Sequence, residues 1–384
     1  MSHPKDRRIR LWSMLLIVGM LLAVSGLAAC GDDEDDQGGG GAAEPAAESG
    51  SDGGSSDDPL QATLDWREQG EKASEEWKIA YVMVGLADGY LQRQKAAAES
   101  SAERYGIELQ VFDSQFNPAT QVKLMQDALA SDFDAYIIQP ASGEAICGMV
   151  RNQLLAQEKP VAIFNNPICG DDDYTEGTVG FVGFQTQPYE TAITMSAFEL
   201  CEDQCKAAVI SGPPGLDLTN RFNAGVEEAK AANPNVEVVV EQAADFNPQK
   251  ALKVAQDALQ AHPDIDLWSS ADDQMTGSIV KAIRDAGKNP EDAIIISEAC
   301  DSTGTELVAS GTIDGSYCAL PVQEAEYPID QMVRFLETGE TTPGFVDLCE
   351  APEVVGPDGI TPDGSSPESC LLTQENADLW TPLY

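Results

Sequence analysis

The residues from 116 to 129 read Phe-Asn-Pro-Ala-Thr-Gln-Val-Lys-Leu-Met-Gln-Asp-Ala-Leu, and those from 246 to 259 read Phe-Asn-Pro-Gln-Lys-Ala-Leu-Lys-Val-Ala-Gln-Asp-Ala-Leu. Eight of the fourteen positions are identical in the two stretches. In each stretch, Asn can cap the free N–H groups of a helix, and Pro at the first helical position loses no hydrogen bond. The repeat therefore predicts two helices of the same design, one in each of two similar halves of the chain.

Short β-branched runs and helical stretches alternate on both sides of the repeated segments. The expected strands are 78–85, 107–112, 135–139, 161–164, 179–183, 207–211, 236–241, 265–269, 293–297 and 312–319. The expected helices are 91–105, 119–131, 144–158, 219–233, 249–261, 273–287, 303–310 and 323–338. Strands that alternate with helices predict parallel sheets with right-handed crossovers. We expect an α/β protein of two similar, doubly wound parallel-sheet lobes, joined by a hinge, with a ligand cleft between them.

The boundaries of the lobes follow from where each series of strands and helices begins and ends. We expect lobe one to comprise residues 77–185 plus about 322–341, and lobe two to comprise residues 186–321. Residues 342–384 are rich in Pro, Gly and acidic residues. We interpret them as a C-terminal extension that is closed by a disulfide.

Composition and charge exclude several classes of function. The chain has 384 residues, 42% of them apolar, and a formal net charge of −43. Such an acidic surface repels phosphate groups, so we expect no nucleic-acid partner. The two histidines are His3 and His262, and the sequence contains no Gly-x-Ser-x-Gly motif. A histidine-based metal site or catalytic triad is therefore not expected, and we predict no enzyme activity, no cofactor and no metal.

The first thirty residues have the pattern of an export signal. Four basic residues precede the apolar run from Leu11 to Leu27, which is followed by Ala28, Ala29 and Cys30. This run is short for a membrane-spanning helix, although an uncleaved membrane anchor stays open as an alternative. Leu-Ala-Ala-Cys resembles the lipobox of bacterial lipoproteins. The resemblance implies that residues 1–29 are a lipoprotein signal peptide and that Cys30 is the lipid-attachment residue.

Residues 30–65 contrast with the rest of the chain. From Gly31 to Asp65 there are eleven acidic residues and no Lys or Arg. A segment of this composition buries too little apolar surface to offset the entropy cost of ordering it. We expect a disordered acidic tether that holds the folded part away from the outer face of the bacterial cell membrane, or in the periplasm.

Eight cysteines remain after Cys30: Cys147, Cys169, Cys201, Cys205, Cys300, Cys318, Cys349 and Cys370. An even number in an exported chain implies disulfides, although sequence alone leaves many pairings open. Closeness in the chain favours 147–169, 201–205, 300–318 and 349–370. A zinc site needs denser spacing, which only the 201–205 pair approaches.

From about Lys78 to Gly344, the chain resembles the type I periplasmic binding proteins, of the kind that bind ribose and galactose. The resemblance depends on the order and spacing of six segments, namely 79–90, 136–140, 160–166, 244–247, 270–275 and 311–321. It implies a monomeric binding protein that captures a small solute between two lobes and delivers it to the permease of an ABC transporter.

The resemblance also implies ligand-binding residues in lobe one, all just after strand ends. Asp88 and Tyr90 follow the first strand, where relatives carry a polar residue and an aromatic ring that covers one face of a sugar. Tyr90 packing only as a loop hydrophobe remains an alternative. Gln139 ends the third strand. Asn165 and Asn166 replace an Asp-Arg pair that is frequent in sugar binders, which removes an arginine fork for hydroxyl groups.

In lobe two, the resemblance implies Arg221 and Phe246. Arg221 lies one position out of register with the arginine of the family. Asn220 is the alternative candidate for this binding position. Phe246 matches the aromatic residue expected opposite Tyr90. Phe116 occupies the equivalent position in the first copy of the repeat. The alternative role for Phe246 is that of a core residue at the start of a helix.

Acidic residues complete the predicted site. Asp272 matches a polar position after the third strand of lobe two, and Asp273 beside it is expected to cap the next helix. After the fourth strand Ala299 stands where an acid is expected, flanked by Glu298 and Asp301, of which we select Asp301. These carboxylates favour a neutral or cationic polyhydroxy or amino compound and disfavour an anion.

These observations combine into one functional hypothesis. We expect an extracytoplasmic, lipid-anchored substrate-binding protein that delivers a small solute, foremost a sugar, to an ABC import permease. The alternative is a ligand-sensing lipoprotein that signals to a membrane receptor without transport. Both hypotheses use the same lobes, so the sequence does not separate them.

Overall fold

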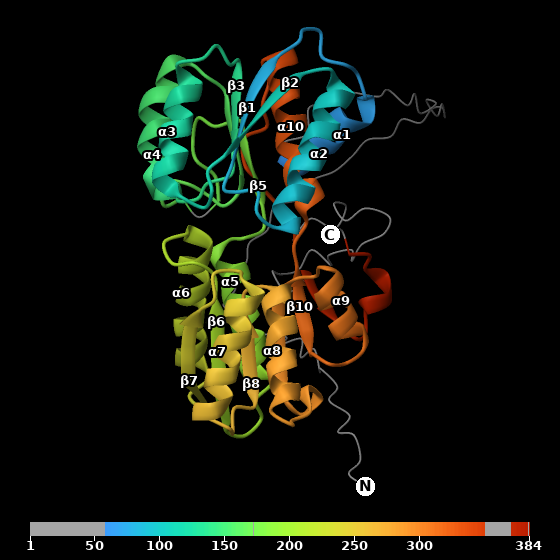
Figure 1. The fold of residues 1–384 in the computed structure, drawn as a ribbon. Helices are drawn as coiled ribbons and strands as arrows, with labels where there is room; N and C mark the ends of the chain where they lie inside the picture. The colour runs from blue at the N-terminus through green and yellow to red at the C-terminus, as the bar shows by residue number, and fades with distance from the viewer. Residues whose placement is uncertain (1–57, 172, 350–369, 383) are drawn as a thin grey trace, which may run out of the picture. The chain divides into compact units, whose positions relative to one another are not determined.

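The computed structural model describes residues 58–171, 173–349, 370–382 and 384. In this part of the chain, the strands form two sheets of six strands each (Figure 1). The first sheet has the order β11-β5-β4-β3-β1-β2, and every neighbouring pair in it is parallel. Its strands are β1 (Lys78–Met83), β2 (Glu108–Asp113), β3 (Ala135–Ile138), β4 (Val161–Asn165), β5 (Gly180–Gly183) and β11 (Phe345–Asp347).

The second sheet repeats this arrangement with the order β12-β10-β9-β8-β6-β7. All of its pairs are parallel except that of β10 with β12. Its strands are β6 (Cys205–Ser211), β7 (Val236–Ala243), β8 (Leu267–Ser270), β9 (Ile294–Ala299), β10 (Gly315–Cys318) and β12 (Leu371–Thr373). The predicted α/β class and the two doubly wound parallel sheets are confirmed.

Helices cover both sheets. With the first sheet lie α1 (Pro59–Gln69), α2 (Gly89–Tyr105), α3 (Pro118–Leu129), α4 (Gly143–Met149) and α10 (Pro321–Thr338). With the second lie α5 (Gln187–Glu199), α6 (Asp217–Ala232), α7 (Pro248–Ala261), α8 (Asp273–Asp285) and α9 (Ser302–Ala309). The helix pairs in most extensive contact are α2 with α10, α5 with α6, and α7 with α8 (Figure 1). None of the described helices is long and apolar enough to cross a membrane.

Strand β1 shows how the first sheet is buried on both faces. Ile79, Tyr81 and Met83 pack into one apolar cluster, and the alternate residues Ala80 and Val82 pack into another. The first cluster includes residues of α2 and α10, and the second includes residues of α3 and α4. A strand that is covered on both sides reads as a continuous apolar run, which is why the sequence predicts it well.

The sequence repeat is also a repeat of backbone conformation. Asn117 and Asn247 cap α3 and α7 with their side-chain oxygens, and a proline follows each of them as predicted. The two residues before each cap, including Phe116 and Phe246, have positive φ angles between 51° and 57°. This left-handed turn brings each ring over a glycine that follows the first strand of its sheet. A Cβ atom at Gly85 or Gly212 would collide with the ring.

Helix α1 corrects the expected tether, which extended to residue 65. The helix begins at Pro59, with Asp58 as its cap, and its residues Leu60 and Leu64 pack against the apolar core. Residues 1–57, which include the expected signal peptide and Cys30, lie outside the described residues. The acidic composition of residues 30–65 gives no sign of α1, because contacts with the rest of the fold stabilise this short helix.

Long-range ion pairs attach this helix to α10. Arg67 forms an ion pair with Glu326 and another with Asp330, whose oxygen lies 3.0 Å from Nη1. Asp330 is fully buried and also accepts hydrogen bonds from Arg104 and Tyr105, both at 2.7 Å. The carboxylate of Asp330 therefore joins α1, α2 and α10.

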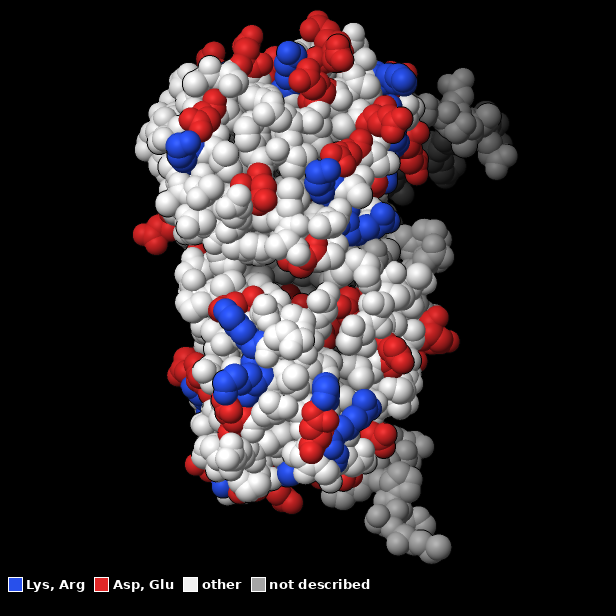
Figure 2. Space-filling view, in the orientation of Figure 1, with Lys and Arg blue, Asp and Glu red and all other residues white. Residues whose placement is uncertain are grey.

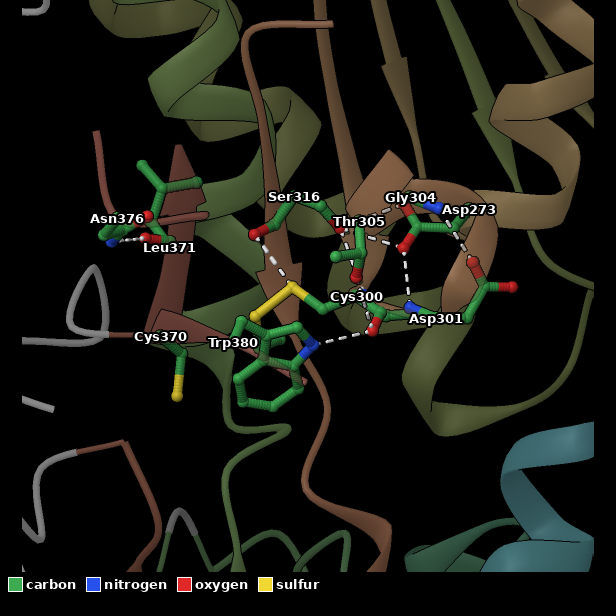
Figure 3. The surroundings of a disulfide bond; sticks show 12 residues. Asp273, Cys300, Asp301, Gly304, Thr305, Ser316, Cys370, Leu371, Asn376 and Trp380 are labelled. Carbon is green, nitrogen blue, oxygen red and sulfur yellow. Dashed lines mark hydrogen bonds between the residues drawn. A yellow bond between two sulfur atoms is a disulfide. The ribbon is translucent and has the colours of Figure 1, made fainter. Parts of the chain in front are cut away.

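The expected C-terminal extension is built into both sheets. Strand β11 extends the first sheet and β12 extends the second, and the disulfide Cys349–Cys370 joins the segments that carry them. Beyond β12, Trp380 donates a hydrogen bond through Nε1 to the carbonyl oxygen of Cys300, at 3.0 Å (Figure 3). The structure contains the three other favoured disulfides as well, namely 147–169, 201–205 and 300–318.

We predict that Arg67→Met lowers the free energy of unfolding by about 1–3 kcal/mol, because Asp330 then stays buried with one cation fewer. Lys123→Met is the matched control, since Lys123 forms an exposed pair with Asp127 within one helix. We expect no measurable change for the control. Chemical denaturation of both variants measures the difference, and equal midpoints would contradict the docking of α1.

Candidate functional site

A pocket lies where strands of the two sheets end. Seven of the nine predicted ligand-binding residues line it. They are Asp88, Tyr90, Gln139, Asn165, Asn166, Phe246 and Asp272. In open α/β sheets, ligands bind beside the carboxyl ends of the strands, and these residues follow that rule.

Backbone geometry fixes the lobe-one residues of the pocket. Asp88 caps α2 by accepting a hydrogen bond from the Leu91 N–H group at 2.8 Å, and this places Tyr90 in the first turn of the helix. Asn165 ends β4 with a φ angle of 72°. Among residues other than Gly, Asn is one of those that tolerate this left-handed conformation best.

Glu324 on α10 accepts hydrogen bonds from side chains of the first lobe, including two that line the pocket. Tyr90 donates a hydrogen bond to its carboxylate, as do Gln94 at 2.8 Å and Asn165 at 3.2 Å. Burial raises the pKa of Glu324 to about 8, although these hydrogen bonds act in the opposite direction. Glu324 does not line the pocket, so it holds Tyr90 and Asn165 in place rather than offering a ligand contact.

On the lobe-two side, Phe246 and Asp272 line the pocket from the turns that precede α7 and α8. Asp272, rather than Asp273, is the residue that caps α8, through the Met275 N–H group at 2.8 Å. Burial, followed by the charges of Asp301 and Asp88, raises the pKa of Asp272 to about 7. Asp272 therefore combines the helix cap and the pocket position, which the sequence assigns to two separate residues, Asp273 and Asp272.

Asp301 is not among the residues that line the pocket. Its side chain caps α9 at the Gly304 N–H group, 2.8 Å away, and its own N–H group donates to Asp273 at 3.1 Å (Figure 3). Asp273 also accepts a hydrogen bond from Ser316, so these two buried acids are tied into the protein by hydrogen bonds next to Asp272. An acidic residue at the end of a strand can either cap the next helix or face the pocket. Asp301 caps α9 and is not among the residues that line the pocket.

Arg221 does not line the pocket either, but it contacts a residue that does. Its Nη1 atom donates to Asn166 Oδ1 at 2.6 Å, which links α6 to the end of the first sheet. A second link joins Asp217 to the Gly143 N–H group at 2.5 Å. Both bonds connect residues of the two lobes beside the pocket.

The selection from sequence misses most of the apolar lining and also five polar or aromatic lining residues, namely Phe116, Gln185, Gln274, Glu298 and Tyr384. The Phe-Asn-Pro repeat could have identified Phe116 as the symmetric counterpart of Phe246. Glu298 was named only as the neighbour of Ala299. Gln185 carried no signal beyond its place between two strand-helix series.

Tyr384 is the least foreseeable of these residues. Its ring centroid lies 5.7 Å from that of Tyr90, and its hydroxyl donates to the Ala299 carbonyl oxygen at 3.1 Å. Its main-chain oxygen accepts a hydrogen bond from the Ser302 N–H group at 3.1 Å. Tyr384 therefore contacts residues of both lobes at the pocket, although it is far along the chain from the strands that form it.

The wall near Tyr384 has an unusual backbone. Ala299 has a φ angle of 125° and Cys300 one of 50°, both in the region that side chains disfavour. The disulfide with Cys318 and the bond from Trp380 hold this turn (Figure 3). Such conformations persist where the surroundings fix them, and they cluster at functional sites.

We predict that the thermal midpoint falls from about pH 5 to about pH 8 and that Glu324→Gln reduces this fall. The pKa of Glu324 rises from the ordinary 4.5 to about 8, so the folded protein holds this proton more tightly than the unfolded chain does. Its contribution to stability is therefore complete below about pH 4.5 and is lost as the pH rises to about 8.

Melting curves at several pH values measure this effect. Glu306→Gln is the matched control, because Glu306 is exposed on α9 and the change in net charge is the same. We expect the control to keep the pH dependence of the parent protein. An undiminished fall in the Glu324→Gln variant would show that Glu324 does not hold a proton at neutral pH.

Comparisons with known proteins agree with this geometry. Residues 79–341 match the sequence profile of the periplasmic binding protein domain. The ribose import binding protein RbsB of Salmonella typhimurium is 24% identical over 270 residues, which cover 66% of this chain and 88% of that protein. The galactofuranose-binding protein YtfQ of Escherichia coli is 22% identical over 316 residues, which cover 77% of this chain and 86% of that protein.

Solved structures share the fold. A galactofuranose binding protein aligns with a TM-score of 0.65 at 19% identity, over 79% of this chain and 97% of that one. The Caulobacter myo-inositol binding protein aligns with a TM-score of 0.65 at 18% identity, over 81% of this chain and 97% of that one. The profile match covers more than half of the chain, and it describes a family of binding proteins rather than enzymes. The chain therefore belongs to the periplasmic binding protein family, with the type I fold of two parallel-sheet lobes.

Proposed function

We propose that this protein binds a small sugar or a sugar-like polyol in the pocket and delivers it to an ABC import permease. The observation that carries the proposal is the composition of the pocket, in which aromatic rings from both lobes accompany carboxyl and amide groups. Several relatives support it by name, since they are called ribose import, galactofuranose-binding and allose-binding proteins. No observation in the described part of the chain favours signalling without transport.

The two repeated phenylalanines give the pocket its apolar surfaces. Phe116 and Phe246 are contributed by equivalent turns of the two lobes, and Tyr90 adds a third ring. Aromatic faces suit the C–H faces of a sugar ring. Carboxylate and amide oxygens around them accept hydrogen bonds from hydroxyl groups. A ligand of this kind makes contacts with both lobes at once.

Such contacts can shift the lobes between conformations. The chain passes from the first sheet to the second between β5 and α5, returns between β10 and α10, and passes to the second sheet again between β11 and β12. A few connecting residues of this kind can absorb the dihedral changes of a hinge. A ligand favours the closed conformation only by binding it more tightly than the open one. We propose that the ligand adds to the two links, at Asn166 and Gly143, that already join the lobes here.

We predict that Phe246→Ala weakens binding of the sugar by about ten- to hundredfold, because an apolar face of the pocket is removed. D-ribose, D-galactose, D-allose and myo-inositol would first be screened for a rise in thermal midpoint, since a ligand of the folded state stabilises it. Calorimetry with the best of them then compares parent and variant.

Phe345→Ala is the matched control for this experiment. Phe345 stacks on Phe181 in the first sheet and does not line the pocket. We expect it to lower stability while leaving the affinity unchanged. Equal affinities of parent and Phe246→Ala would show that the ligand binds elsewhere, and no thermal shift with any of the four compounds or with their amino-substituted derivatives would contradict the proposed class of ligand.

We further propose that the protein is exported and anchored by lipid on Cys30 after removal of residues 1–29. The support is the sequence Leu27-Ala28-Ala29-Cys30 behind a basic and apolar start. A single acyl chain gives only marginal membrane binding, so stable anchoring requires at least two. The protein would act as a monomer at the outer face of the membrane or in the periplasm.

We predict that the protein is in the membrane fraction of its host and that Cys30→Ser releases it from that fraction. Mass spectrometry of the mature parent protein should find an acylated N-terminal cysteine. Cys147→Ser is the control for loss of a cysteine as such, because Cys147 forms a disulfide. An unmodified Cys30 in the membrane-bound parent would contradict the proposed anchor.

A further inference from the structure

Three carboxyl groups line the pocket, and they come from both lobes. Asp88 precedes α2, Asp272 precedes α8, and Glu298 lies near the end of β9. None of the lining residues is Lys, Arg or His. The pocket surface therefore carries acidic groups without a basic group of its own.

The arginine that contacts a lining residue of the pocket, Arg221, is itself engaged. Arg221 donates to Asn166, and its charge acts on the buried Glu190, whose pKa burial raises to about 8 and Arg221 lowers. On the face of the molecule in Figure 2, Lys and Arg side chains likewise lie among acidic ones. No side chain on the pocket surface therefore balances the charge of the three acids.

Buried acceptor atoms in this pocket lack donors. Glu298 is 4% exposed, and its Oε2 atom has no hydrogen-bond partner among the described residues. Its Oε1 atom accepts only a long hydrogen bond from Gln185 Nε2, at 3.3 Å. Gln185 is 5% exposed, and its own Oε1 atom also lacks a donor. A buried acceptor without a donor is costly, so these two oxygens call for a group that donates several hydrogen bonds.

A metal ion does not fit this requirement. Among the described residues, no three acidic, histidine or cysteine side chains converge closely enough to hold one. An ammonium group fits better, because it has a full positive charge and three hydrogen-bond donors in a small volume. Aromatic rings around the pocket can also contact such a cation or the ring that carries it.

We infer that the ligand carries a protonated amino group on a small polyhydroxylated ring, and that Glu298 and Asp272, with the oxygen of Gln185, bind this group. The inference rests on the proposed function and narrows its ligand class from neutral sugars to amino sugars or aminocyclitols. Phe116, Phe246 and Tyr90 would contact the ring, and the remaining polar residues its hydroxyl groups.

The pKa values agree with this assignment. Burial raises the pKa of Glu298 well above its ordinary value, and the charges of Glu190, Asp272 and Glu324 add to the rise. The pKa of Asp272 rises to about 7 for similar reasons. A positive charge beside these carboxyls favours their ionised forms and relieves their mutual repulsion.

The test compares compounds that differ in one substituent. Calorimetry with the mature full-length protein, at about pH 7 and about 0.15 M salt, would use D-galactosamine, D-galactose and N-acetyl-D-galactosamine. A second set would be an amino-deoxy-inositol and myo-inositol. We expect the amino compound of at least one set to bind about tenfold tighter or more than its uncharged counterparts.

A pair of variants locates the effect. Glu298→Gln removes the carboxyl group that a bound ammonium group would hold in its ionised form but keeps the shape, and we expect it to abolish the preference for the amino compound. Glu306→Gln removes the same charge from an exposed position of α9, and we expect it to leave the preference unchanged. An equal loss in both variants would mean that the effect is one of overall charge, and the assignment to Glu298 would be wrong.

The comparison on the parent protein stands even if Glu298→Gln does not fold. If the uncharged compounds bind as tightly as the amino compounds or tighter, the inference is overturned while the proposed sugar-binding function stands. If neither kind of compound binds to folded protein, both the inference and the proposed function are wrong.

Discussion

In each sheet of this protein the core strands run parallel, so their carboxyl ends meet at one edge. Parallel strands need crossover helices, and each helix begins at the edge where a strand has just ended. The first residues after a strand are therefore both helix caps and candidates for the pocket, as Asp88 and Asp272 show. The positions of the site residues depend on this constraint, and so does the burial of their carboxyl groups.

The sequence predicts the parts of the fold that local chemistry determines. Asn117 and Asn247 cap their helices, and the apolar runs of the core strands lie where expected. Helix α5 was not predicted, because it is buried on most sides and lacks a polar stripe. Helix α1 was not predicted because its attachment depends on Asp330, a residue 263 positions away from Arg67. The spacing of apolar residues in the sequence indicates a helix that is buried on one face. It does not indicate a helix that is buried on most sides, or one that a distant ion pair holds in place.

The same distinction applies to the site. Site residues that directly follow strands could be predicted, because the parallel arrangement of the strands brings these residues together regardless of the conformation of the loops. Glu298 and Tyr384 could not, because the turn at Ala299 and the segment after β12 determine their places. Trp380, bound to the Cys300 carbonyl oxygen, shows how that segment is held (Figure 3). Tyr384 lies outside residues 79–341, so the family match alone does not reach it.

The two glutamates near the pocket illustrate how burial separates support from recognition. Glu324 receives hydrogen bonds from three side chains, which compensate its burial and fix the residues that donate them. Glu298 receives one long bond and keeps an oxygen without a donor. A carboxyl group whose oxygens already accept hydrogen bonds within the protein has no free acceptor for a ligand. An acid that is buried as deeply but left incomplete costs stability in the free protein, and a bound donor would recover that cost. This difference in hydrogen bonding, rather than burial or charge as such, assigns Glu324 to the scaffold and Glu298 to the ligand.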